Sequence, residues 1–208
     1  MFVTHTHHTS LRIVVLASGS GTLLQSILDN QGKYQVVGVV SDVECPALDR
    51  ARRAAIPTEL VELARGANPQ TREEWNKRLA EVVDKLQPDV VVSAGFMKIL
   101  GAPFLSRFGG RTINTHPALL PAFPGAHAVR DALAYGVKVT GSTVHFVDAG
   151  VDTGPIIAQE PVAIKPGESE SELHERIKQV ERKLIVNVLN SATVAADNQG
   201  EVNFANHE

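Results

Sequence analysis

Short apolar, β-branched runs alternate with amphipathic stretches along this chain, and this alternation constrains its fold more than any other feature. Runs of this kind are typical of buried strands, and the stretches between them fit crossover helices. Strands are predicted at 11–17, 34–42, 56–63, 89–94, 111–116, 137–148 and 154–164. Helices are predicted at 22–30, 46–55, 127–136 and 171–194. One more helix begins at a capping-box pattern, Thr71 and Glu74, and ends before Pro88.

The connection between the last two predicted strands, residues 149–153, is too short for a crossover helix, so this pair is predicted to be antiparallel. The chain has 208 residues, 43% of them hydrophobic, which fits one domain with a well-filled core. The predicted fold class is therefore α/β: a single-domain, mostly parallel Rossmann-like sheet with helices on both faces and a late antiparallel strand pair. We expect the domain at 11–194, between a disordered leader at 1–10 and a frayed tail at 195–208.

Composition narrows the classes of function. The net charge is -3 with scattered Lys and Arg, so neither a nucleic-acid surface nor a membrane-binding cluster is indicated. No apolar run approaches the roughly 18 residues of a membrane span. Cys45 is the only cysteine, which excludes an internal disulfide and fits the reducing cytoplasm. A small-molecule ligand is favoured, and the oligomeric state, a homodimer included, is left open.

Four polar segments follow predicted strands: SGSGT at 18–22, GFMKIL at 95–100, NTHPALLP at 114–121 and AGVDTG at 149–154. In an open α/β sheet, ligands bind at the carboxyl ends of the strands, near the point where the strand order reverses. The sequence therefore predicts that these segments converge on one site.

The glycine-rich segment SGSGT opens a helix, so its free amides and the helix dipole favour a phosphate group. It lacks the lysine of a Walker loop. It matches a dinucleotide fingerprint in part, because Leu24 stands where a third glycine belongs and Asp42 could bind a ribose. A phosphate site, a dinucleotide site and a plain structural turn all remain open at this stage.

Asn114 and His116 are two residues apart on a predicted strand, so both side chains point to the same side of it. An amide and an imidazole can both donate to the oxyanion that forms at a carbonyl carbon. Asp152 could hold the imidazole protonated or order a water that carries protons. The alternatives are a core histidine for His116 and a turn residue for Asp152.

The chain shows no motif that carries its own nucleophile, so in an acyl transfer the substrate must supply the attacking atom. A metal site made of His116, His145 and Asp152 is conceivable, but His145 lies in an alternating strand and better fits packing or a local hydrogen bond. His5, His7 and His8 are predicted to belong to the disordered leader. We therefore expect no metal.

Three segments carry a resemblance to a known family: N-x-H-P-x-L-L-P-x-F-x-G at 114–125, GFMKIL at 95–100 and GSTVHFVDAGVDTGPII at 141–157. They resemble the folate-dependent formyltransferases. IVVLASGSGTLLQSIL at 13–28 is similar to the branch that formylates phosphoribosylglycinamide in purine (IMP) biosynthesis. The resemblance implies transfer of the formyl group of 10-formyltetrahydrofolate, a co-substrate, to the amine of that ribonucleotide.

The resemblance also implies roles for individual residues. The catalytic residues would be Asn114, His116 and Asp152. The ribonucleotide would be bound by Ser20, Gly21, Thr22, Leu23 and Glu181. The folate would contact Arg72, Met97, Lys98, Ile99, Leu100, Asn114, Val147 and Asp148. Leu23 departs from the family, since many members have Asn at that place and could contact the substrate with its side chain.

Three rival functions follow from the same features. Hydrolysis of the same folate is catalysed by related enzymes that usually carry an additional N-terminal domain, whereas only a short leader precedes Leu11 here. Formylation of an initiator transfer RNA would call for a C-terminal RNA-binding domain and a basic surface. A non-catalytic dinucleotide sensor would rest on the glycine-rich turn and Asp42.

Overall fold

The computed structural model describes residues 10–194 and 202–204 of the chain. A seven-stranded sheet runs through it in the order β3-β2-β1-β4-β5-β6-β7. Its strands are β1 (Leu11–Leu16), β2 (Tyr34–Ser41), β3 (Thr58–Leu60), β4 (Val90–Ser93), β5 (Thr112–His116), β6 (Val139–Phe146) and β7 (Ile156–Ala163). The pairs formed by β1 to β5 are parallel, whereas β6 is antiparallel to both β5 and β7. The predicted fold class is confirmed, including the late antiparallel strand pair.

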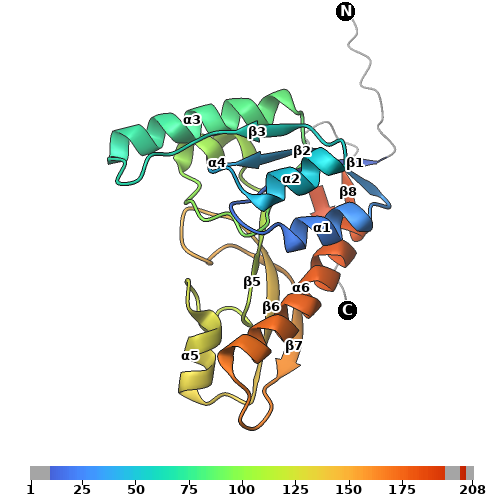
Figure 1. Ribbon diagram of the computed structural model, residues 1–208, viewed down its shortest axis with the longest axis vertical. Coiled ribbons are helices and arrows are strands. Elements are labelled where there is room, and N and C mark those ends of the chain that lie inside the picture. Colours follow the sequence, from blue (N-terminus) through green and yellow to red (C-terminus); the bar gives the residue numbers. More distant parts are fainter. Residues whose placement is uncertain (1–9, 195–201, 205–208) are drawn as a thin grey trace, which may run out of the picture.

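In the part of the chain that the structure describes, six helices cover the sheet (Figure 1). They are α1 (Thr22–Asp29), α2 (Pro46–Arg53), α3 (Pro69–Lys85), α4 (Ala102–Phe108), α5 (Ala128–Tyr135) and α6 (Glu170–Ser191). Alternate residues of β1 face opposite layers, because successive side chains of a strand point to opposite sides. Ile13 lies in the core under α1, α2 and the end of α6, and Val14 lies in the core under α3 and α4.

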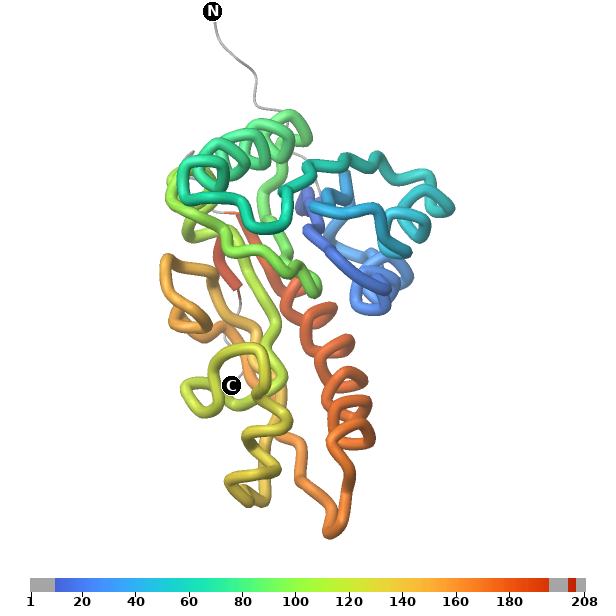
Figure 2. Tube along the Cα trace, turned by 60° about the vertical axis from the view of Figure 1, so that its left-hand side comes forward, coloured from blue at the N-terminus to red at the C-terminus, as the bar shows by residue number. Residues whose placement is uncertain are grey.

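The long helix α6 runs from the lower part of the molecule to about its middle (Figure 2). Its first turns pack with α5 and β7 through Leu173 and Ile177, and its last turns join the core under β1. This explains the apolar stripe at helical spacing that the sequence shows there. Among the described residues, no helix combines the length and the apolar character needed to cross a membrane.

The starts of two helices differ from the sequence prediction. α3 begins at Pro69, and its N-cap is Asn68, whose side-chain oxygen accepts from the N–H of Thr71 at 2.8 Å. The predicted capping box at Thr71 is therefore wrong, because a proline fits the first helical position and Asn68 caps the helix three residues earlier. A capping box occurs instead at Ser169 and Glu172, where it starts α6. The short helix α4 is absent from the sequence prediction.

The end of the chain also differs from the prediction. The last helix ends at Ser191, and β8 (Ala192–Val194) then pairs antiparallel with β9 (Val202–Phe204). Val202 is buried and Phe204 packs edge-on against Phe146, so this part of the predicted tail is folded onto the domain. Residues 1–9 of the predicted leader at 1–10, with its three histidines, and the rest of the tail lie outside the described residues.

Candidate active site

A cleft of about 780 Å³ opens at the carboxyl ends of β1, β4 and β5. The strand order reverses between β1 and β4, which is where ligands bind in open α/β sheets. All four polar segments that the sequence singled out contribute to its lining, together with residues of α6. The predicted convergence of these segments is therefore observed.

Asn114, His116 and Asp152 meet in this cleft. The first two lie on the same side of β5, and Oδ2 of Asp152 is 3.3 Å from Nδ1 of His116. Asp152 has a left-handed backbone, with φ at 55°, and its Oδ2 also accepts from the N–H of Gly125 at 2.8 Å. These contacts attach the loop between β6 and β7 to the end of the segment 114–125, so the carboxylate is held beside the imidazole.

The other ring nitrogen of His116 is fixed by the backbone. Nε2 lies 2.7 Å from the carbonyl oxygen of Phe123. A carbonyl oxygen can only accept, so Nε2 carries a proton, and Nδ1 then faces a carboxylate. The ring of His116 is therefore held between a backbone carbonyl and the carboxylate of Asp152. The prolines around Phe123, which has φ at 53°, help to hold the carbonyl in this position.

His145 sets the orientation of the Asn114 amide. The two residues are cross-strand partners on β5 and β6, and Nε2 of His145 lies 3.4 Å from Nδ2 of Asn114. Nδ1 of His145 donates to the carbonyl of Phe146 at 2.9 Å. Burial lowers the pKa of His145, although Asp152, whose Oδ1 is 3.7 Å away, opposes that shift. A neutral ring with its proton on Nδ1 accepts one N–H of Asn114 and leaves the other N–H for the cleft.

The predicted metal alternative has little geometric support. One nitrogen of His116 and one of His145 donate to backbone carbonyl oxygens, so only Nδ1 of His116 and Nε2 of His145 would remain for a metal ion. Within 10–194 and 202–204, no group of three His, Cys, Asp or Glu side chains is arranged to hold a metal ion.

The glycine-rich turn leads directly into α1. Gly21 is the N-cap with φ at 72°, and a Cβ there would lie 2.7 Å from Cα of Ala47, so both conformation and space require glycine. The start of α1 has neither a side-chain cap nor an acidic residue in its first turn. Its first N–H groups therefore remain available at the cleft, which is the property that makes a helix start bind anions.

Asp42 does not fulfil the role that the dinucleotide alternative gave it. Its side chain is 4% exposed and lies 3.3 Å from Nζ of Lys98. Its other oxygen accepts from Oγ of Ser18 at 2.5 Å. Both carboxylate oxygens are thus engaged inside the protein, and a ribose has no access to them.

α6 contributes a mixed-charge face to the cleft. His174, Lys178 and Arg182 line it at intervals of four residues, with Glu181 among them. The sequence analysis missed the three basic residues; their helical spacing beside Glu181 was the available signal. Glu181 is partly buried and accepts a hydrogen bond from Oγ1 of Thr115. Burial raises the pKa of Glu181, and the Thr115 contact opposes that shift.

The formyl transferase family model matches residues 11–189, which is most of the chain. The chain belongs to the formyl transferase family. A formyl transferase of Mycobacterium tuberculosis, named phosphoribosylglycinamide formyltransferase, is 58% identical over 178 residues, covering 84% of this chain and 81% of that protein. The resemblance drawn from the sequence is confirmed at the level of the family.

Solved structures of formyl transferases share the fold. The crystal structure of glycinamide ribonucleotide transformylase 1 from Symbiobacterium toebii has a TM-score of 0.83 at 37% identity, covering 94% of this chain and 95% of that one. The crystal structure of phosphoribosylglycinamide formyltransferase from Streptococcus pneumoniae has a TM-score of 0.79 at 36% identity, covering 86% and 97%.

Two positions that the resemblance singled out, Leu23 and Arg72, are placed differently from the others relative to the cleft and the core. Leu23 lines the cleft, but it also packs against the core beneath α1, as expected for an apolar side chain. Arg72 is exposed on α3 and donates from Nε to the carbonyl of Ala67 at 3.0 Å, and it is not part of the cleft lining. The remaining residues that the resemblance implied all line the cleft.

Replacing Glu181 by Gln is expected to stabilise the ligand-free protein by about 0.5–2 kcal/mol at neutral pH. The glutamine does not ionise in its partly buried position, and its Oε1 can still accept the hydrogen bond from Thr115. The folded-state pKa of Glu181 lies above its usual value of 4.5. The ionisation penalty is therefore absent below that usual value and grows as the pH rises through the folded-state pKa. Thermal unfolding of both proteins across this range measures the effect, and equal stability at neutral pH would contradict it.

Proposed function

We propose that this formyl transferase moves the formyl group of 10-formyltetrahydrofolate to the amine of phosphoribosylglycinamide, a step of purine (IMP) biosynthesis. The observation that supports this most directly is the placement of Asn114, His116 and Asp152 in the cleft that also contains the open start of α1. The first group of residues suits chemistry at a formyl carbon, and the helix start suits a ribonucleotide phosphate. The names of the relatives point to the same ribonucleotide and to transfer of a formyl group.

The proposed reaction is a direct attack by the free amine of the ribonucleotide on the formyl carbon. A carbon–nitrogen bond forms, and the formyl oxygen becomes an oxyanion that receives hydrogen bonds from Asn114 and from the Nδ1–H of protonated His116. This Nδ1 lies 3.3 Å from Oδ2 of Asp152, and its N–H is shared between that carboxylate and the oxyanion. Asp152 keeps His116 charged and assists transfer of the ammonium proton through water to the leaving nitrogen of the folate. The bond between the formyl carbon and that nitrogen then breaks. No metal takes part in this proposal.

The proposed binding sites divide the cleft between the substrates. The phosphate lies at residues 20–23 and the start of α1, where Lys178 and Arg182 add positive charge, and Glu181 holds the rest of the ribonucleotide. The folate lies along 97–100 and the backbone at 147–148, where Met97 and Ile99 are 77% and 71% exposed and offer apolar surface. Arg72, outside the cleft, is retained only as a contact for the negatively charged tail of the folate.

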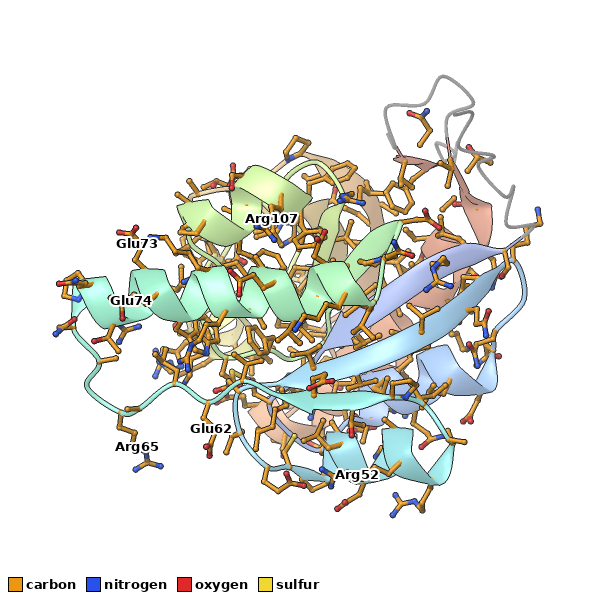
Figure 3. All side chains as sticks on the ribbon, turned by 90° about the horizontal axis from the view of Figure 1, so that it is seen from above. Arg52, Glu62, Arg65, Glu73, Glu74 and Arg107 are labelled. Atoms are coloured by element: carbon orange, nitrogen blue, oxygen red, sulfur yellow. The ribbon has the colours of Figure 1, made fainter. Side chains whose placement is uncertain are left out.

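The rival functions have less support. The engaged carboxylate of Asp42 disfavours a dinucleotide sensor. On the face seen from above in Figure 3, the labelled charged side chains are of both signs: Arg52, Arg65 and Arg107, and Glu62, Glu73 and Glu74. This mixture disfavours transfer RNA on this face. Hydrolysis of the folate uses the same apparatus, so only an assay separates it from transfer.

The test is formyl transfer from 10-formyltetrahydrofolate, measured with and without phosphoribosylglycinamide and in the presence of a strong chelator. We expect deformylation of the folate only when the amine is present, with equimolar formylated product and no loss of activity on chelation. Folate turnover that proceeds equally without the amine would assign hydrolysis instead. Activity that disappears on chelation and returns with a divalent ion would overturn the metal-free part of the proposal.

Thr22→Glu is expected to raise the KM for phosphoribosylglycinamide by at least about tenfold, because the added carboxylate occupies the first position of α1 and repels the phosphate. The same charge favours the helix itself, so folding should not suffer. Thr22→Gln is the matched neutral control and should change this KM less than about threefold. Steady-state kinetics in both substrates measure the effect. An equal rise in the KM for the folate would count against residues 20–23 as the phosphate site.

A further inference from the structure

A buried carboxylate, Asp42, connects two loops that line the cleft. It stands just beyond the end of β2, and its side chain is 4% exposed. Oδ1 accepts from Oγ of Ser18 at 2.5 Å, and Oδ2 lies 3.3 Å from Nζ of Lys98. Asp42 does not belong to the cleft lining, so within the described part of the chain it reaches a substrate only through these two partners.

Ser18 makes two hydrogen bonds of opposite direction with its hydroxyl. It donates to Asp42 and accepts from the N–H of Met97 at 3.0 Å. A serine hydroxyl has one proton and two lone pairs, so both bonds form together. The N–H of Ser18 also donates to the carbonyl of Gly95 at 3.3 Å. The segment 95–98 is therefore attached to the end of β1 and to Asp42 at Gly95, Met97 and Lys98.

These attachments join the segments assigned to the two substrates. Residues 20–23, the proposed phosphate site, begin two positions after Ser18, and residues 97–100 form the proposed folate surface. Met97 and Ile99 expose large apolar side chains to water, whereas a loop without such attachments would tend to bury them. An ion pair on an open surface contributes little, whereas a buried carboxylate that loses its partner is left uncompensated.

We propose that Asp42 is a positioning residue for folate binding, which acts by holding the segment 95–100, through Ser18 and Lys98, in the conformation that receives the folate. This inference rests on the proposed function. It assigns to Lys98 a role through its ammonium group and Asp42, rather than through direct contact with the folate alone.

Kinetics of three variants test the assignment. Asp42→Asn keeps the shape of the side chain but removes the charge that Lys98 faces. Lys98→Met removes the other charge and leaves the contact between Asp42 and Ser18 in place. Both variants should raise the KM and the Kd for the folate at least about tenfold while kcat stays within about threefold, because the reacting groups are untouched. Lys98→Arg can still pair with Asp42 and should bind the folate at least about threefold more tightly than Lys98→Met, in both KM and Kd.

Trp75 provides a readout that does not depend on activity. It is the only tryptophan of the chain, it is fully buried, and its ring stacks on Phe96 with a centroid separation of 6.2 Å. Phe96 belongs to the segment that Asp42 holds. The near-ultraviolet circular dichroism of Trp75 should weaken in Asp42→Asn and in Lys98→Met, remain in Lys98→Arg, and return when saturating folate is added.

The outcomes separate this inference from the proposed function. If the unaltered protein does not transfer the formyl group, the proposed function fails. If it does, and both charge-removing variants bind folate normally with an unchanged Trp75 signal, the inference about Asp42 is wrong. A loss of thermal stability in Asp42→Asn, with folate affinity unchanged in both variants, would show that Asp42 serves the fold alone. Should Asp42→Asn not fold, the Trp75 signal of ligand-free Lys98→Met decides, because losing only a direct contact between Lys98 and the folate would leave that signal unchanged.

Discussion

Replacing Asp152 by Asn is expected to slow formyl transfer by at least about a hundredfold in single turnover while folate affinity changes less than about tenfold. The amide keeps the shape of the side chain, tolerates the left-handed backbone at this position and can still accept from Gly125. It removes the negative charge that lies 3.3 Å from Nδ1 of His116. An amide also cannot take up the proton that the attacking amine loses. Rapid-quench measurement with enzyme in excess isolates the chemical step.

His116→Ala and the double variant complete this experiment. His116→Ala should also lose at least about a hundredfold in rate, since a charged donor to the oxyanion disappears. The double variant should lose less than the product of the two single losses, because His116 and Asp152 act as one unit. A near-normal rate for Asp152→Asn would show Asp152 to be a turn residue only. Fully multiplicative losses would show that the two side chains work independently.

The sheet and the position of the cleft could be predicted from the sequence, because both follow from local patterns. Alternating apolar runs specify a parallel sheet, and the ends of its strands mark the ligand edge. The period of two along a strand places Asn114 and His116 on one side without any knowledge of the fold. The contact between Asp152 and His116 could not be predicted from such a pattern, because it depends on the path of the loop between β6 and β7.

The features that could not be predicted depend on register and on backbone contacts. His145 lies beside Asn114 because of the exact pairing of β5 with β6, and register between strands distant in sequence is not visible in either strand alone. The carbonyl of Phe123 that fixes His116 belongs to the backbone, which carries no residue signal. The basic residues of α6 had the right spacing, but the sequence does not say which helix face meets the cleft.

The same limits explain the wrong boundaries. Several residues near a helix start can act as caps, and Asn68 prevails over Thr71 because Pro69 already fits the first position of α3. The paired strands β8 and β9 have only three residues each, and each has a polar residue at its centre. Neither therefore forms an apolar run long enough to predict a strand. In both cases a tertiary or backbone contact selects among local alternatives that the sequence alone leaves equivalent.

Asn114→Ala is expected to lower the single-turnover rate of formyl transfer by about 10²–10³, which is the usual loss for one oxyanion donor. Nε2 of His145, 3.4 Å from the Asn114 amide nitrogen, accepts one of its N–H groups and leaves the other for the oxyanion. Asn114→Asp distinguishes the effect of side-chain shape from that of hydrogen-bond donation. The carboxylate fills the same space, but it can only accept hydrogen bonds and it adds negative charge near the oxyanion. It should therefore be at least as slow as Asn114→Ala, with folate affinity within about tenfold in both variants. A faster rate for Asn114→Asp than for Asn114→Ala would mean that the side chain at 114 acts by filling space, and the oxyanion would then rely on His116.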